Sequence, residues 1–168
     1  MLDSLVVIQG DWKEQIMEAY GKMQALPPYS YQRNAFYAKI WEMSQVAFDI
    51  PREVQVVTDD NDKLFISVGS PGFVSFDGQE EVLRGMKLPL DLWVHTHPSG
   101  DAYFSDRDFK TINIWHTKLN QAVVLGNKEM VKLTFRNVTP STHYYETVSW
   151  DYAVTDENND WYMESEEE

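Results

Sequence analysis

The feature that most restricts the fold of this chain is a short apolar run that leads directly into two histidines. The run is Asp91-Leu-Trp-Val94, and His95 and His97 come after it. A run of this length, bounded by turn residues, is typical of a buried strand in the centre of a sheet. The Pro-Ser-Gly sequence after His97 favours a turn, and residues 105 to about 118 have a helical pattern. We therefore expect a strand, a turn and a helix in succession at the centre of the fold.

Helices and strands also intermingle along the rest of the chain, which predicts an α/β (α+β) domain with helices packed against a sheet. Residues 11 to about 23 are expected to be helical, because Asp11 and Glu14 resemble a capping box with Asp in place of Ser or Thr. Residues 32–48 have the clearest amphipathic pattern, with one stripe made of Phe36, Ile40, Met43 and Ala47. Strands are expected at 5–9, 53–58, 63–69, 73–76, 122–125 and 131–135, and one helical turn at 80–85.

The length of 168 residues predicts a single domain, which we assign to residues 1–150. Residues 151–168 differ in character, because they contain eight acidic residues and no Lys or Arg. A flexible acidic tail is the simplest interpretation of this segment. The alternative is that Trp161, Tyr162 and Met163 contact a partner or fold over a functional site.

Charge and cysteine content exclude several classes of function. A formal net charge of −13 disfavours binding to nucleic acid or to anionic membranes, because such binding depends largely on Lys and Arg. The chain has no cysteine, so any metal site must use His and carboxylate ligands. No segment has the pattern of a signal peptide or the length of a membrane span. We therefore expect a soluble, cytoplasmic protein.

The two histidines and a following aspartate have the spacing of a metal site. His95 and His97 are two residues apart at a strand end, so both imidazoles point to the same face. The turn can return the next helix over this strand end, so that Asp108 in its first turn supplies a third ligand. Two imidazoles and one carboxylate suit Zn²⁺ and leave a fourth tetrahedral position for water. Ser105 is placed to cap the same helix and to face that position.

This segment resembles the JAMM motif of the JAB/MPN metalloprotease superfamily, whose members include deubiquitinating isopeptidases. The match consists of His95-x-His97, seven residues, Ser105, two residues and Asp108. The sequence His-Pro-Ser-Gly is also similar to that of RadC-type members. The resemblance implies a JAB/MPN-like (cytidine-deaminase-like) mixed central sheet flanked by helices. It also implies that His95, His97 and Asp108 bind zinc, and that Ser105 stabilises the oxygen of the reacting carbonyl.

The same family requires a glutamate upstream of the motif, on the strand after the first major helix. Pro51-Arg52-Glu53 matches that placement, so the resemblance assigns the general base to Glu53. The strand continues as Val54-Gln-Val-Val57, without the glycines that are usual in the family. Glu42 is the alternative base, but it lies inside a predicted helix, where an exposed charge is the simpler interpretation.

The implied activity is zinc-dependent hydrolysis of an isopeptide or peptide bond, with a protein or peptide substrate such as the tail of a ubiquitin-like modifier. One alternative is a RadC-like or phage-associated protein that acts on another amide. Another is an assembly or binding module that retains zinc without turnover. Outside the motif, His116 and His143 are expected to have structural or surface roles. Trp93, Tyr103 and Phe104 can line a substrate groove or pack in the core.

Overall fold

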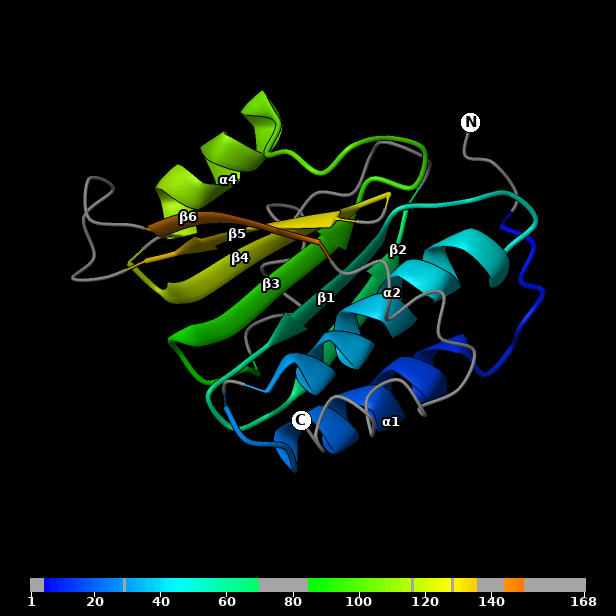
Figure 1. The fold of residues 1–168 in the computed structure, drawn as a ribbon, viewed down its shortest axis with the longest axis horizontal. Helices are drawn as coiled ribbons and strands as arrows, with labels where there is room; N and C mark the ends of the chain where they lie inside the picture. The colour runs from blue at the N-terminus through cyan, green and yellow to red at the C-terminus, as the bar shows by residue number, and fades with distance from the viewer. Residues whose placement is uncertain are drawn as a thin grey trace.

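The structure is a computed structural model that describes residues 5–28, 30–69, 85–115, 117–127 and 129–135, and the backbone of 144–149. Its centre is a six-stranded mixed sheet with the order β2-β1-β3-β4-β5-β6 (Figure 1). Strands β3 and β4 are parallel, and the other neighbouring pairs are antiparallel. The bounds are Val54–Thr58 (β1), Leu64–Val68 (β2), Leu90–Thr96 (β3), Leu119–Gly126 (β4), Glu129–Thr134 (β5) and Tyr144–Ser149 (β6).

Helices cover both faces of this sheet, so the described chain forms three layers (Figure 1). Helices α1 (Trp12–Gln24) and α2 (Asn34–Val46) lie on one face, with the 3₁₀ helix η1 (Tyr31–Arg33) between them in sequence. Helix α4 (Asp106–Trp115) connects β3 to β4 and lies on the other face. The mixed α+β class and the single domain expected from the sequence are therefore confirmed.

Strand β3 runs through the middle of the sheet and contributes to both cores. Leu92 and Val94 pack in the cluster beneath α1 and α2, whereas Trp93 packs in the cluster beneath α4. This division follows from the two-residue period of a strand, which sends successive side chains to opposite faces. His95 comes two residues after Trp93 and therefore faces the α4 side. The apolar run predicted as a buried strand is buried on both faces, as the sequence indicated.

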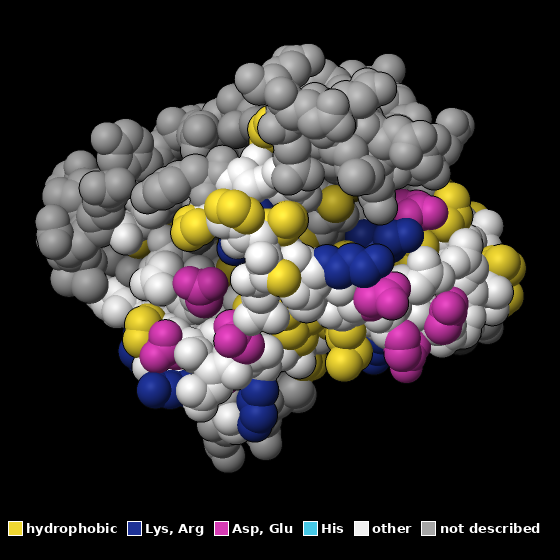
Figure 2. Space-filling model, turned by 60° about the horizontal axis from the view of Figure 1, so that its bottom comes forward, with side chains coloured by type: hydrophobic (Ala, Val, Ile, Leu, Met, Phe, Trp, Pro, Cys, Tyr) yellow, Lys and Arg dark blue, Asp and Glu magenta, His cyan; other side chains and the backbone are white. Residues whose placement is uncertain are grey.

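The predicted stripe of α2 is the centre of the first core. Its four members have no exposed surface and pack between α1 and the sheet: Phe36, Ile40, Met43 and Ala47. An apolar stripe at this spacing covers one side of a helix and must be buried against another element. Figure 2 shows acidic, basic and apolar side chains interspersed on the face of the molecule that it brings forward.

Two expectations for the first residues of the chain are wrong. Residues 5–9 form no strand; Val7 makes one isolated bridge with Phe48, just after α2. The side chains at 5–8 are exposed, so this segment has no buried face that would favour a regular strand. The Asp11 side chain does not cap α1 and instead accepts a hydrogen bond from Gln15 Nε2 at 3.0 Å. No capping box therefore forms, although α1 begins at the predicted position.

Other expectations fall outside the described residues or were not made. The predicted strand at 73–76, most of the turn at 80–85 and the acidic tail at 151–168 lie outside the described part of the chain. Strand β6 was not predicted, and it pairs with β5 at the edge of the sheet.

Among the helices that the structure describes, none has the length and apolar character needed to cross a membrane.

Candidate metal centre

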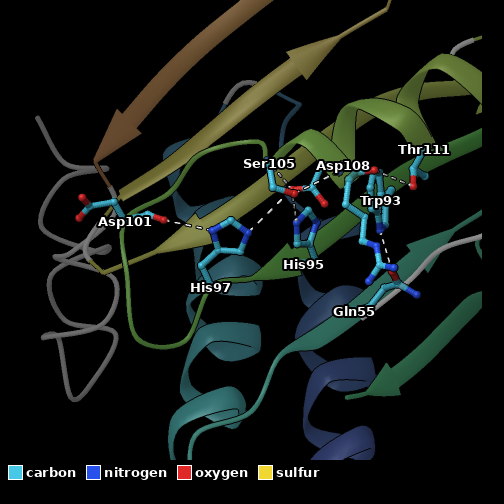
Figure 3. A network of polar contacts seen from close by, with 9 residues as sticks. Gln55, Trp93, His95, His97, Asp101, Ser105, Asp108 and Thr111 are labelled. Atoms are coloured by element: carbon cyan, nitrogen blue, oxygen red, sulfur yellow. Dashed lines mark hydrogen bonds and ion pairs between the residues drawn. The ribbon is translucent and has the colours of Figure 1, made fainter. Parts of the chain in front are cut away.

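The end of β3 and the first turn of α4 bring three potential metal ligands together (Figure 3). His95 Nε2 lies 3.1 Å from Asp108 Oδ2, and His97 Nε2 lies 3.8 Å from the same oxygen. One ligand atom from each of these three residues lies within 4.8 Å of the other two. The structure thus brings together the two histidines and the aspartate that the spacing had suggested.

These separations match the dimensions of a small metal centre. Tetrahedral ligands that are each 2.0–2.1 Å from a metal lie about 3.3 Å from one another. The two distances from Asp108 Oδ2 fall on either side of this value, at 3.1 and 3.8 Å. Two imidazole nitrogens and a carboxylate oxygen are also a donor set that divalent transition metals prefer. The group His95, His97 and Asp108 can therefore hold a metal ion with only small side-chain movements.

Asp108 is held in place by a capping box at the start of α4. Its backbone N–H donates to Ser105 Oγ at 3.1 Å, and its Oδ2 accepts from the Ser105 backbone N–H at 2.9 Å. This reciprocal pair satisfies two N–H groups at a helix start. The Ser-x-x-Asp pattern therefore forms the helix start that is typical of it, and the Asp108 oxygen that accepts from the Ser105 N–H also faces the two histidines.

His97 is oriented by the loop that follows it. Its Nδ1–H donates to the backbone oxygen of Asp101 at 3.2 Å, which leaves the lone pair of Nε2 directed toward Asp108 (Figure 3). A hydrogen bond of this kind sets the tautomer and ring orientation of a metal-binding histidine. The Tyr103 ring also packs against the His97 imidazole in a T-shaped arrangement, with 4.6 Å between ring centroids.

His95 is the most deeply buried of the three, with 1% of its surface exposed. Its ring stacks on Trp93 at a centroid distance of 4.9 Å and an angle of 23°. Trp93 is held in turn, because its Nε1–H donates to Gln55 Oε1 at 2.9 Å. Among the described residues, His95 Nδ1 has no hydrogen-bond partner, whereas Nε2 faces Asp108. Nε2 is therefore the nitrogen placed to bind a metal.

The electrostatics of these side chains favour a positive charge between them. Burial alone would raise the pKa of Asp108, but His95, His97 and the Ser105 N–H together hold it well below its ordinary value. Burial alone would lower the pKa of His95, but the charge and hydrogen bond of Asp108, with a contribution from Glu53, raise it above 6.5. A carboxylate that remains ionised while buried attracts a cation.

His97 and Asp108 line a cavity of about 200 Å³ that is also lined by the other two residues assigned from the sequence. Glu53, which is 4% exposed, precedes β1 and lines this cavity together with Ser105. Strand β1 pairs with β3 so that Gln55 lies opposite His95. Glu53 lies two residues before Gln55, directly before β1 begins, and by the two-residue period of extended backbone it faces the same side of the sheet as Gln55.

Glu42 lies elsewhere and does not line the cavity. Its side chain on α2 is 47% exposed and forms an ion pair with Lys39 at 2.7 Å. This is the exposed helical charge that the sequence pattern favoured for this position. Of the two glutamates considered, Glu53 is the one that the fold places beside His97 and Asp108.

The aromatic residues near the motif have different positions. Trp93 and Phe104 are buried in the core beneath α4, whereas Tyr103 is 54% exposed and lines the cavity. Arg107 also lines the cavity and was not singled out from the sequence. His116 and His143 lie outside the described residues.

The sequence analysis also did not identify two groups that hold the histidines in place. Gln55 accepts the hydrogen bond from Trp93, on which His95 stacks, and the Asp101 carbonyl accepts from His97. The two-residue period of β1 offers a signal for Gln55, since it places this side chain on the same face as Glu53. The Asp101 carbonyl has no equivalent signal, because it belongs to the backbone of a loop.

The chain matches no protein-family model, and no curated protein or solved structure matches it. Any functional assignment therefore depends on the residues of the site themselves.

Proposed function

We propose that this protein is a zinc-dependent hydrolase of the JAMM type that cleaves an isopeptide or peptide bond in a protein or peptide substrate. The observation that carries the proposal is the presence of Glu53 in the same cavity as His97, Ser105 and Asp108. A metal-binding group alone is compatible with a structural role. A carboxylate beside an open ligand set is what metal-assisted hydrolysis requires.

Zinc is the metal that best fits the donor set. Catalytic zinc sites use three protein ligands, often two histidines and a carboxylate, and keep the fourth position for water or substrate. His95, His97 and Asp108 match this set, and the chain has no cysteine that would complete a closed structural site. When bound here, zinc would supply a nucleophilic water at neutral pH and polarise the carbonyl of the substrate.

Glu53 is assigned the proton transfers of the reaction. Its carboxylate accepts a proton from the attacking water and delivers it to the departing amine. Such a general base contributes typically ~10² to 10⁴ in rate. Burial of Glu53 beside the cavity is consistent with this role, because a carboxylate there is shielded from bulk water.

Ser105 is assigned the stabilisation of the oxyanion. Its Oγ accepts the Asp108 backbone N–H, so the hydroxyl hydrogen is the part of this group that can be donated into the cavity. Loss of one such donor typically costs about 2.7 to 4 kcal/mol in transition-state stabilisation. The helix cap fixes the position of the hydroxyl before substrate binds.

The proposal is tested with purified, zinc-loaded protein and a panel of substrates joined by peptide or isopeptide bonds, including fusions to ubiquitin-like modifiers. We expect cleavage that a chelator abolishes and that added zinc restores. Glu53→Gln should bind zinc as tightly as the wild type and lose at least about 10² in kcat. Glu42→Gln is the matched control and should retain full activity, because Glu42 is an exposed helical residue.

Two results would contradict the proposal. Stoichiometric zinc binding without cleavage of any peptide or isopeptide bond would favour a binding or assembly module. Full activity of Glu53→Gln would reject Glu53 as the base even if the protein is a hydrolase.

A further inference from the structure

Gly126, the last residue of β4, lies against the loop that follows His97. A Cβ atom at this position would be 2.2 Å from Ala102 N, 2.6 Å from Asp101 C and 2.8 Å from Ala102 Cα. Real Cβ atoms essentially never approach other atoms closer than 3.0 Å. Gly10, Gly21 and Gly100 are different, because a Cβ at any of them has nothing within 4 Å.

The group that Gly126 contacts is the peptide bond between Asp101 and Ala102. The carbonyl oxygen of this same peptide bond accepts the hydrogen bond from His97 Nδ1. Any displacement of the peptide bond therefore moves the acceptor that orients the imidazole. An alanine at position 126 would require a movement of at least 0.8 Å, from 2.2 to 3.0 Å.

The loop cannot easily absorb this movement elsewhere, because hydrogen bonds hold it on both sides of Gly126. His97 N–H donates to Leu125 O at 2.8 Å, and Asn127 N–H donates to Gly100 O at 3.1 Å. From the other side of the sheet, Gln45 Nε2 donates to Pro98 O at 2.8 Å. The loop is thus held against the end of β4, with Gly126 as the point of closest approach.

We propose that Gly126 is a positioning residue for the metal site: the missing side chain lets the Asp101–Ala102 peptide bond approach β4 and direct His97 Nε2 toward the metal. This inference rests on the metal site of the proposed function, but it does not depend on the reaction catalysed. Loss of the partner that orients a metal-binding histidine typically reduces metal affinity 10- to 100-fold.

The first test compares the zinc affinity of Gly126→Ala with that of the wild type, by competition with a chromogenic chelator. We expect Gly126→Ala to bind zinc about 10 to 100 times more weakly. Gly21→Ala is the matched control, because it adds the same methyl group at a glycine with open space, and its affinity should be unchanged. Wild-type affinity in Gly126→Ala would overturn the proposal.

A second test separates positioning from general damage to the fold. The effect of Gly126→Ala is measured again in a His97→Ala background. Because Gly126 acts through His97, we expect no further loss of zinc affinity in the double variant. The same fold-loss in both backgrounds would show that the effect does not pass through His97 and would overturn the proposal.

If Gly126→Ala does not fold, Gln45→Leu replaces it in both experiments. This variant removes the donor to Pro98 without placing an atom against the backbone, so the same loop is loosened by another route. We expect a several-fold loss of zinc affinity that disappears in the His97→Ala background, and an unchanged affinity would overturn the proposal. Zinc affinity is the readout throughout, so an absence of cleavage would contradict the proposed function and leave this inference intact.

Discussion

The backbone N–H of Val54 donates to the side-chain hydroxyl of Thr96 at 2.9 Å. Thr96 lies between the two candidate ligands His95 and His97 at the end of β3, and Val54 directly follows Glu53. Both residues are fully buried. This single bond therefore links the end of β3, beside the two histidines, to the start of β1, beside the proposed general base.

Thr96→Val should affect the proposed general base, Glu53, more than the candidate metal ligands. Valine keeps the shape of threonine but cannot accept the hydrogen bond, so the buried Val54 N–H loses its partner, at a cost of about 1 to 3 kcal/mol in stability. We expect kcat to fall more than zinc affinity, because the displacement affects Glu53 and leaves all three ligands in place. Urea unfolding, zinc titration and kinetics measure the three quantities.

The control for this prediction is Thr96→Ser, which retains the hydroxyl. It should keep kcat close to that of the wild type and lose only the contribution of one buried methyl group. Equal losses of kcat in both variants would show that the hydroxyl does not position Glu53.

Substitutions of Ser105 should distinguish its capping role from its proposed catalytic role. Ser105→Ala removes the N-cap oxygen and should lower stability by about 0.5 to 2 kcal/mol, whereas glycine at an N-cap costs only a few tenths. Both variants lack the hydroxyl, so both should lose about 10² to 10³ in kcat. Thermal unfolding with parallel kinetics checks this, and near-normal kcat in Ser105→Gly would remove Ser105 from the reaction.

Zinc binding should weaken as the pH falls. In the metal-free protein Asp108 and Glu53 raise the pKa of His95 above 6.5, and only the neutral imidazole binds a metal. Affinity should therefore be highest above this raised pKa and decrease as the pH falls through it. Calorimetric titration in two buffers of different ionisation enthalpy should detect proton release on binding. An affinity that is constant between about pH 5.5 and 8.5 would contradict this expectation.

Asp59, which is 2% exposed, should make the fold sensitive to acid. Its carboxylate accepts 2.8 Å hydrogen bonds from the backbone N–H groups of Asn61, Lys63 and Lys87. Burial opposes the charge, but these donors lower the pKa of Asp59 below 3.8. Since the folded pKa is the lower one, the stabilisation is complete above the unfolded pKa. It is lost as the pH falls through the folded pKa.

Asp59→Asn should therefore lower the free energy of unfolding at pH 7 by about 1 to 3 kcal/mol, because an amide group replaces one of the accepting oxygens. The difference from the wild type should shrink in acid, where the wild-type carboxyl is itself protonated. Asp60→Asn is the control. Its side chain is half-exposed and paired with Lys87 at 3.4 Å, so the change should stay within about 1 kcal/mol. Urea unfolding at pH 7 and at about pH 3 measures both variants.

Local sequence patterns were enough to predict most of the secondary structure and the convergence of the three candidate metal ligands. The strand at Asp91-Leu-Trp-Val94 and the stripe of α2 follow from apolar periodicity, which reflects backbone geometry alone. His95, His97 and Asp108 belong to one continuous segment, so the strand period, the turn and the helix cap are enough to predict their convergence. The strand predicted at 5–9 was wrong, because an apolar run alone does not show whether a partner strand is available to pair with it.

Tertiary structure alone decided which groups surround those ligands. The family resemblance favoured Glu53 over Glu42 from the sequence, but only the pairing of β1 with β3 placed Glu53 in the cavity. The contact of Gly126 with the Asp101–Ala102 peptide bond likewise joins segments that are distant in sequence. The physical reason is that spacing along a strand or helix is set by local backbone geometry, whereas the distance between strands depends on how the whole sheet packs.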